Sequence, residues 1–441
     1  MSPDCGMSAT TERAAPDDGE ALSGDRGVMA QRILILGGGT GGTIMANRLR
    51  RMYAPDDAEI TVVDRDDAHV YQPGLLFVPF GLADVAHLVR PRQRQLRRDV
   101  RYLEAEIDHV DTAASEVRLG HGVVLGYDLL IVATGARLVP EESEGMTGDG
   151  WLETVFPFYT PEGATALAGA LERFEGGRLV VNVVDMPIKC PVAPLEFAFL
   201  ADWYLTERGI RDRTELVYVT PLDGAFTKPV ASQMLAGLLD SKDIGLVTEF
   251  NAGSVDGKRG KLCSYDDREE PFDLLVTVPL HAGAACIDRS PGLGDDTGFI
   301  PTDPSTLQAK AADNVFAIGD ATNLPTSKAG SVTHFEADTL AANIKRFLAG
   351  QPLEGSFDGH ANCFIETGFH KALLIDFNYD VEPLPGRYPF EHLGPLPLLR
   401  ESRSNHLAKL LFQWVYWHAL LPGRDIPAIS PRLHHIAKEH A

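Results

Sequence analysis

Residues 31–64 read QRILILGGGTGGTIMANRLRRMYAPDDAEITVVD and contain the pattern that decides the fold. The apolar run at 32–36 predicts a short buried strand, and residues 44–51 predict a helix. Three glycines between them have G-x-G-x-x-G spacing: Gly37, Gly39 and Gly42. Glycines at this spacing allow a tight turn and let the backbone approach a pyrophosphate, which then lies at the positive end of the helix. The stretch therefore predicts a dinucleotide-binding turn.

A second predicted strand, at 59–63, ends in Asp64. A carboxylate at this place can accept hydrogen bonds from the ribose of an adenosine. A glycine-rich turn alone is a weak signal, and an ordinary glycine-rich loop is the alternative. Strand, glycines, helix, strand and terminal acid in this order are much more specific.

The composition indicates a large folded protein that does not bind nucleic acid. The chain has 441 residues, 44% of them hydrophobic, so two or three domains with substantial cores are expected. Its formal charge of -22 repels polyanions, whereas phosphate backbones are bound by clustered Lys and Arg. No metal site is predicted.

No run of about 20 apolar residues is present, so no segment is expected to span a bilayer. Residues 1–29 form an acidic tail rich in Ser, Thr, Gly and Pro, for which we predict disorder. The tail has no secretory signal pattern, which favours a cytoplasmic protein. Five cysteines in so long a chain do not make a disulfide scaffold, so a cysteine with a function is expected to be catalytic or redox-active.

Two further segments resemble the paired motifs of the FAD- and pyridine-nucleotide-dependent disulfide reductase superfamily. One predicted strand ends in Ala-Thr-Gly, at Thr134 and Gly135, and another ends in Ile-Gly-Asp, at Gly319 and Asp320. The resemblance implies that FAD is the cofactor and that Asp320 binds its ribityl chain. A carboxylate at the C-terminal end of a strand is well placed to accept hydrogen bonds from ribityl hydroxyls. Pro73 is assigned to the same cofactor site.

The two motifs lie on either side of a long insertion, so the FAD-binding domain is expected to be discontinuous. We assign residues 30–150 and 292–360 to it and residues 151–291 to a second Rossmann-like domain. A strand at 178–184 and a helix at 193–208 support the second domain.

The turn between that strand and helix has no glycine. It reads Asp-Met-Pro-Ile-Lys-Cys-Pro-Val from residue 185 to residue 192. Side chains and two prolines would obstruct a pyrophosphate there, and Asp185 would repel it. We therefore expect the second domain to have lost NADH.

Cys190 lies in this turn, just before the helix and next to Lys189. Both the helix dipole and the neighbouring cation are expected to favour its thiolate over its thiol. A buried, inert cysteine is the open alternative.

With this turn the sequence resembles the sulfide:quinone oxidoreductase family, which commonly shows Cys-x-x-Ala-Pro-x-Glu at this place. The motif runs here from Cys190 to Glu196, and Cys363 is the only candidate for the second cysteine expected after the flavin segment. The resemblance covers about residues 30–430. It implies that both cysteines meet at one face of the flavin as a redox disulfide or polysulfide bridge. Hydrosulfide would attack this bridge, the Cys363 thiolate would pass electrons to FAD, and quinone would take them at the opposite ring face while sulfur leaves as polysulfide.

Two more residues take roles by the same resemblance. Glu196 is expected to face the sulfurs and to shuttle protons as a general acid or base, or else only to complement the helix dipole. Lys328 matches a lysine near the flavin pyrimidine, where a cation stabilises the reduced ring; a solvated loop lysine is the alternative. The third cysteine that many family members carry is missing from residues 136–160, so the number of sulfurs held per cycle stays open.

Residues 405–421 predict an amphipathic helix that is too short to span a membrane. Its apolar residues at helical spacing are Leu407, Leu410, Leu411, Trp414, Trp417 and Leu421. Such a face suits the headgroup boundary, and six basic against three acidic residues within 400–441 would orient the protein onto anionic lipid. We assign residues 361–441 to a region that contacts quinone and membrane. A helix buried in the core or in a dimer interface is the alternative.

These patterns predict an α/β fold with two Rossmann-like dinucleotide-binding domains of the disulfide-reductase type plus a C-terminal amphipathic membrane-association segment. We expect a peripheral FAD enzyme at the cytoplasmic side of the cell membrane, with sulfide and membrane quinone as partners and room for a homo-oligomer. The nearest alternative is a type II NADH:quinone dehydrogenase, which would need glycines at 185–190. A sulfide dehydrogenase that reduces a cytochrome would normally need an export signal, and a non-enzymatic FAD-binding redox sensor would not respond catalytically to sulfide.

Overall fold

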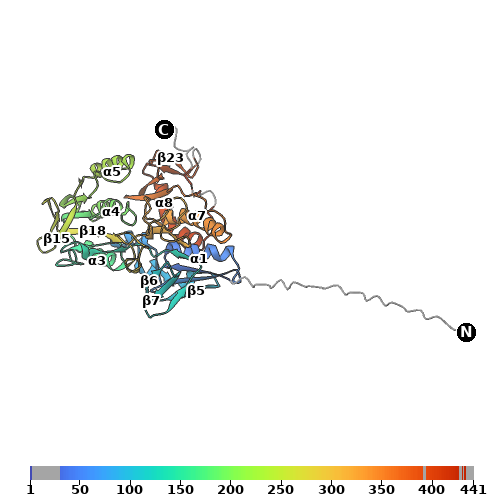
Figure 1. The fold of residues 1–441 in the computed structure, drawn as a ribbon. Coiled ribbons are helices and arrows are strands. Elements are labelled where there is room, and N and C mark those ends of the chain that lie inside the picture. The colour runs from blue at the N-terminus through green and yellow to red at the C-terminus, as the bar shows by residue number, and fades with distance from the viewer. Residues whose placement is uncertain (2–29, 391–393, 427–429, 431, 434–441) are drawn as a thin grey trace.

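The computed structural model describes residues 1, 30–390, 394–426, 430, 432 and 433. The tail predicted at 1–29, apart from Met1, and the basic residue Lys438 lie outside the described residues. The described chain forms two parallel sheets and a C-terminal region that packs against the elements around both (Figure 1).

The first sheet has five parallel strands in the order β20-β9-β1-β2-β5. They are β20 (Val315–Ala317), β9 (Leu129–Val132), β1 (Gln31–Leu36), β2 (Ala58–Asp64) and β5 (Val100–Glu104). The central strands are runs of Val, Ile and Leu that are buried on both faces, as expected for a parallel sheet between two layers. Because β20 pairs with β9, the sheet is assembled from two separated stretches of the chain.

The two faces of this sheet have different covers. Ile33 and Ile35 face a pair of helices, whereas Leu34 and Leu36 face a small antiparallel sheet. The covering elements are α1 (Thr40–Met52), α7 (Gly330–Leu348), β6 (Ile107–Asp111), β7 (Glu116–Leu119) and β8 (Val124–Gly126). The helix predicted at 44–51 begins earlier, at Thr40, so its first turn follows the glycine turn directly.

The second sheet repeats the parallel arrangement in the order β11-β18-β12-β13-β14. Its strands are β11 (Val155–Phe156), β18 (Leu274–Val278), β12 (Gly177–Val183), β13 (Thr214–Val219) and β14 (Ile244–Val247). Around it lie α3 (Pro161–Arg173), α4 (Ala193–Glu207), α5 (Pro229–Ser241) and an antiparallel sheet of β15 (Ala252–Asp256), β16 (Lys261–Ser264) and β17 (Glu269–Pro271). The α4 helix begins at Ala193, as predicted, directly after the turn that contains Cys190.

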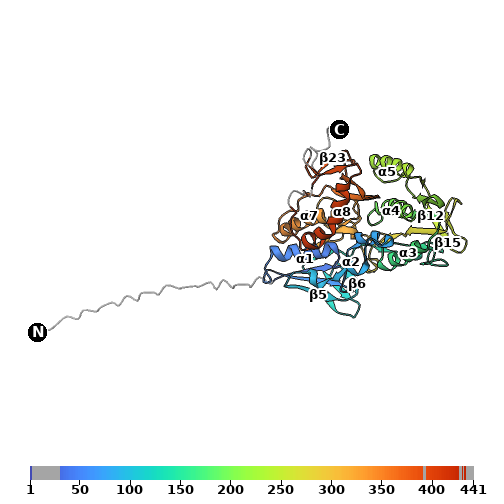
Figure 2. The same ribbon diagram turned by 180° about the vertical axis from the view of Figure 1, so that it is seen from behind.

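The C-terminal region starts with an antiparallel hairpin that packs against α4 and α7. The hairpin consists of β21 (Ala361–Gly368) and β22 (Lys371–Phe377), and α8 (Arg403–Val415) packs on it. A π-helical turn, Tyr416–Leu420, continues α8. Figures 1 and 2 show α8 and α7 beside α1, with the elements of the second sheet on the other side of the hairpin region.

Shorter elements connect these parts. They are β3 (Ala68–Val70), β4 (Val89–Pro91), β10 (Arg137–Leu138), β19 (His281–Ala282), β23 (Gly386–Tyr388), β24 (Leu396–Leu398), α2 (Val85–Leu88), α6 (Ala285–Asp288) and the 3-10 segment η1 (Gln72–Phe80). In the described part of the chain, no helix has the length and apolar character needed to cross a bilayer.

Candidate functional site

The turn between β1 and α1 has room for a ligand at only one of its predicted glycines. A Cβ on Gly37 would lie 2.4 Å from the carbonyl oxygen of Ala133, and a Cβ on Gly42 would lie 1.8 Å from that of Gly37. A Cβ on Gly39 would meet no atom within 4 Å. Gly37 and Gly42 are therefore needed for close packing of the backbone, while Gly39 borders open space at the start of α1.

Asp64 holds the glycine turn from the end of β2. Its Oδ2 accepts a hydrogen bond from the backbone N–H of Gly38 (2.7 Å) and forms an ion pair with Arg92, a mostly buried arginine. The carboxylate thus lies at the carboxyl edge of the first sheet, next to the turn, where a ribose is expected.

The same edge carries the two other predicted motifs. The hydroxyl oxygen of Thr134 is buried and has no hydrogen-bond partner among the described residues, and a Cβ on Gly135 would meet no atom within 4 Å. The N–H of Gly319 donates to Glu336 (2.6 Å), and Asp320 follows it. An unpartnered hydroxyl and bare backbone beside a helix N-terminus are what a bound dinucleotide requires.

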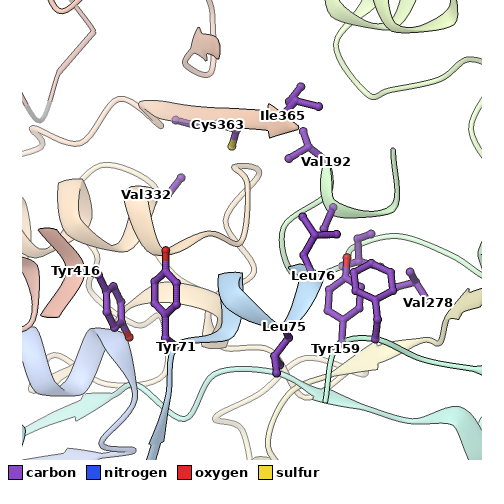
Figure 3. Packing of buried hydrophobic residues seen from close by; sticks show 14 of the residues in the cluster. Tyr71, Leu75, Leu76, Tyr159, Val192, Val278, Val332, Cys363, Ile365 and Tyr416 are labelled. Carbon is purple, nitrogen blue, oxygen red and sulfur yellow. The ribbon is translucent and has the colours of Figure 1, made fainter. Parts of the chain in front are cut away.

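Pro73 lies apart from these groups in its exposure. It is the second residue of the 3-10 segment η1 and is exposed, whereas Leu75 and Leu76 of the same segment are buried (Figure 3). Its assignment to the cofactor site stays a prediction.

The turn that lacks glycine packs onto the segment before α7. Lys189 and Lys328 form a parallel β-bridge, and the N–H of Cys190 donates to the carbonyl of Lys328 (2.7 Å). Cys190 has a φ of 46°, in the left-handed region. The turn is thereby fixed against the same segment that follows Asp320, and its side chains lie where a second dinucleotide would need open backbone.

Lys328 is not a solvated loop lysine. It is 6% exposed, its ammonium donates to the carbonyls of Asp320 (3.1 Å) and Thr322, and it lies 4.0 Å from the centre of the Phe299 ring. Burial raises the pKa of Asp320, and the charges of Lys328 and Lys189 oppose this rise. The structure therefore brings two buried cations to the carboxylate predicted to bind a ribityl chain.

Cys363 approaches the same region from β21. It is 6% exposed, and Figure 3 shows its sulfur pointing from the strand into the buried cluster that contains Tyr71, Val192 and Val332. Its charge acts on the pKa of Cys190, so the two cysteines, from turn and strand, share one electrostatic environment. Both are free thiols in this structure.

Glu196 and Lys409 complete this cluster. Oε1 of Glu196 accepts hydrogen bonds from the N–H of Glu366 (2.7 Å) and from the ammonium of Lys409, which also donates to the carbonyl of Phe364 (3.2 Å). Glu196 is 1% exposed. Among the charged groups, Glu196 has the largest effect on the pKa of both Cys190 and Cys363.

The two thiols of this cluster are weak acids. Burial, followed by the charge of Glu196, raises the pKa of Cys363 to about 12, although the charge of Lys409 opposes this rise. Burial, followed by Glu196 and Cys363, also raises the pKa of Cys190. The expectation that Lys189 and the helix dipole favour the Cys190 thiolate was therefore wrong: desolvation dominates, and Lys189 acts on Asp320 instead.

The apolar residues predicted for one face of a C-terminal helix separate into two groups. Leu407, Leu410, Leu411 and Trp414 are 63%, 49%, 58% and 59% exposed, and we call them the α8 apolar surface. Trp417 and Leu421 are buried, so their place on an exposed face was wrong. Tyr416 explains the difference, because its hydroxyl bonds Thr40 and His69 (both 2.7 Å) and ties the π-helical turn to the first sheet's elements.

Comparisons with known proteins identify relatives of this chain. The family model described as pyridine nucleotide-disulphide oxidoreductase matches residues 31–181. The mitochondrial sulfide:quinone oxidoreductase of Mus musculus is 26% identical over 412 residues, covering 92% of this chain and 89% of that protein. The crystal structure of the sulfide:quinone oxidoreductase from Aquifex aeolicus matches with a TM-score of 0.75 and 18% identity, covering 90% of this chain and 92% of that one.

The chain is similar to sulfide:quinone oxidoreductases along most of its length.

The chain is an FAD-dependent oxidoreductase. Its α/β fold with two Rossmann-like parallel sheets is confirmed. A relative of another kind is the alternative NAD(P)H-ubiquinone oxidoreductase C1 of Arabidopsis thaliana, which is 31% identical over 370 residues, covering 73% of this chain and 68% of that protein. The FAD fits the first sheet's carboxyl edge, where Gly39, Thr134 and Gly135 offer space and an unpartnered hydroxyl.

The family resemblance did not reveal four residues that the structure connects to Glu196 or to β21. Lys409 was counted with the basic groups expected at a lipid surface, but it is buried beside Glu196. Glu366 and His406 form a buried pair at 3.0 Å, and His370 lies next to His406. Glu366 and Cys363 share β21 in Cys-Phe-Ile-Glu, which is the one sequence signal for a charged group near the second cysteine.

Proposed function

We propose that this protein oxidises sulfide and passes the electrons through FAD to a membrane quinone. The observation that carries the proposal is the buried cluster of Cys190, Cys363 and Glu196, which lies beside the turn that would otherwise hold NADH. The sulfide:quinone oxidoreductases named above support the same substrates.

Cys190 and Cys363 act as a redox pair in this proposal. Hydrosulfide attacks the disulfide between them, so that one S–S bond breaks, a persulfide forms on Cys190 and the thiolate of Cys363 leaves. The thiolate of Cys363 and the persulfide on Cys190 would then form an S–S bond and give up two electrons to bound FAD, so that the bridge closes again around a zero-valent sulfur. Repeated cycles release it as polysulfide. With no third cysteine in residues 136–160, this pair carries the whole sulfur chain.

FAD supplies the two-electron acceptor between sulfide and quinone. Gly37, Gly39 and Gly42 with α1 hold its pyrophosphate, and Asp64 holds its ribose. Asp320, near Thr134, Gly135 and Gly319, would bind the ribityl chain. Pro73 would border the site. Lys328 lies beside Asp320 and offers a buried cation to the flavin ring.

The α8 apolar surface holds the enzyme on the membrane. Three leucines and a tryptophan that are about half exposed or more can enter the headgroup boundary, and exposed Arg400, Arg403, Arg424 and Arg432 can contact anionic lipid. We place the protein on the cytoplasmic side, as a peripheral protein. The domain boundaries at 150, 291 and 360 and a homo-oligomer belong to the same proposal.

Anaerobic mixing of the FAD-loaded protein with sulfide, and separately with NADH, tests the function through the flavin absorbance. We expect bleaching by sulfide and none by NADH. The variants Cys190→Ser and Cys363→Ser should keep FAD but should no longer be bleached by sulfide. The control Cys263→Ser, on β16 beside the second sheet, should behave as the unchanged protein. Bleaching by NADH would favour the type II dehydrogenase alternative, and no response to sulfide would refute the proposal.

A further inference from the structure

A row of ionisable side chains leads from the two cysteines to the protein surface. It begins at Glu196, continues through Lys409 and Glu366, and ends at His406 beside His370. These groups come from three elements, α4, β21 and α8, and from the turn after β21. None is needed to hold FAD in the function proposed above.

The pairs Glu196–Lys409 and Glu366–His406 are in direct contact, and the link between Lys409 and Glu366 is electrostatic. Lys409 donates to Glu196, and the charge of Glu366 also acts on Lys409 and raises its pKa, although burial alone would lower it. Nδ1 of His406 lies 3.0 Å from both carboxylate oxygens of Glu366. The ring of His370 lies 5.7 Å from that of His406.

Burial decreases outward along the row. Glu196 and Glu366 are each 1% exposed, the side chains of Lys409 and His406 are 11% and 17% exposed, and His370 is exposed. Buried charges are costly unless they are paired, and even paired ones contribute little to stability. A row of them that reaches solvent on one side therefore suggests a function. Packing alone would be satisfied by apolar residues at these positions.

We propose that Lys409, Glu366 and His406 carry to solvent the proton that H2S loses to Glu196. The inference rests on the proposed function. The carboxylate of Glu196 takes a proton from H2S and leaves HS⁻, the nucleophile that attacks the disulfide. Lys409 receives that proton as it gives one of its own to Glu366, and Glu366 passes it to His406, which releases it to water. Charge and protons balance, and no electrons move in this step.

The two thiols, when reduced, do not offer an alternative route for this proton. The pKa of Cys363 is raised to about 12 and that of Cys190 is also raised, so neither thiol readily exchanges a proton at neutral pH. The sulfur cluster is enclosed by apolar residues such as Ile365 and Val192 (Figure 3). The row of charged side chains offers a proton a path out of these apolar surroundings.

The test is anaerobic stopped-flow reduction of the flavin by sulfide in the FAD-loaded protein. We compare His406→Ala and Glu366→Gln with His87→Ala, a change at an exposed histidine of α2. Both relay variants should reduce flavin on the order of 10-fold to 100-fold more slowly, and His87→Ala should match the unchanged protein. Added imidazole should restore the rate of His406→Ala, because the position borders solvent.

FAD content and melting temperature are measured on every variant, and His406→Gln replaces His406→Ala if the latter is unstable. Wild-type rates in both relay variants overturn the relay, and so does a slow His406→Ala that holds FAD yet gains nothing from imidazole. Failure of the unchanged protein to respond to sulfide overturns the proposed function itself, which is a different result.

Discussion

Lys409 of α8 forms a buried ion pair with Glu196 of α4, 213 residues earlier in the chain. The pair connects the helix that carries the α8 apolar surface to the helix that follows the Cys190 turn. Because each partner is nearly inaccessible to water, neither charge is tolerated alone. The ion pair therefore holds the C-terminal region in place against the sulfur cluster.

We expect Lys409→Met to destabilise the protein more than other changes on α8. Leaving a buried carboxylate without its partner costs about 3–5 kcal/mol in the free energy of unfolding. Glu196→Gln combined with Lys409→Met should recover most of this loss, because the double variant leaves no charge. Urea unfolding measures both, with Arg403→Met, an exposed residue of the same helix, as control. Equal stability of the Lys409 and Arg403 variants would contradict the prediction.

The reduced protein should protect its two central thiols from alkylation. Since the pKa values of Cys190 and Cys363 are raised, we expect iodoacetamide at pH 7.5 to modify both at least about tenfold more slowly than free cysteine. Cys363, which is more buried, should be the slower of the two. Mass spectrometry of peptides after timed labelling gives each rate, with partly exposed Cys263 as the internal reference. A Cys190 that reacts faster than Cys263 would show that its thiolate is favoured after all.

Removing part of the α8 apolar surface should weaken membrane binding. Each buried leucine contributes about 1.5–3 kcal/mol, so Leu407→Gln with Leu411→Gln should reduce affinity for vesicles of phosphatidylcholine and phosphatidylglycerol at least about tenfold. Flavin reduction by sulfide in solution should not change, because these side chains point to solvent. Leu82→Gln, at an exposed leucine near η1, is the matched control for vesicle flotation. If the double variant floats with vesicles as well as the unchanged protein does, the α8 apolar surface does not bind the membrane.

The stability of the protein should depend on the charge of Glu336 in α7. Burial raises the pKa of this carboxyl from 4.5 to about 7, although the Gly319 N–H lowers it. The folded state therefore holds more protons than the unfolded state between those pH values, and stability falls as pH rises through that window. Glu336→Gln keeps an acceptor oxygen and removes the titration. We expect its unfolding free energy to fall less from pH 5 to pH 7.5, by on the order of 3 kcal/mol. Urea unfolding at both pH values checks this, and parallel pH dependences would contradict it.

Local patterns in the sequence predicted most of the fold. The glycine turn could be predicted because its geometry depends on few neighbouring residues. Backbone atoms of the same strand-turn-helix unit and of the adjacent strand leave no space for a side chain at Gly37 or Gly42. The start of α4 at Ala193 followed from the turn before it in the same way.

Tertiary contacts decided the rest of the site. Trp417 fits an exposed apolar face by helical spacing, yet Arg90 stacks on its ring at 4.3 Å and buries it. By its sequence neighbours Lys409 is expected at the surface, but the fold brings Glu196 of the distant helix α4 into contact with it. The pKa of Cys190 depends on burial and on charged groups of β21 and α8, which are distant in sequence. It could therefore not be predicted from the residues next to Cys190.

The pairing of β20 with β9 has a consequence for biosynthesis. Val315 joins Leu130 only after every strand of the second sheet has left the ribosome, so β9 keeps an open hydrogen-bonding edge throughout that interval. Asp320 and the start of α7 arrive later still. We therefore expect nascent chains cut before residue 315 to aggregate unless a chaperone covers that edge, and cofactor capture to be among the last events in the maturation of this enzyme.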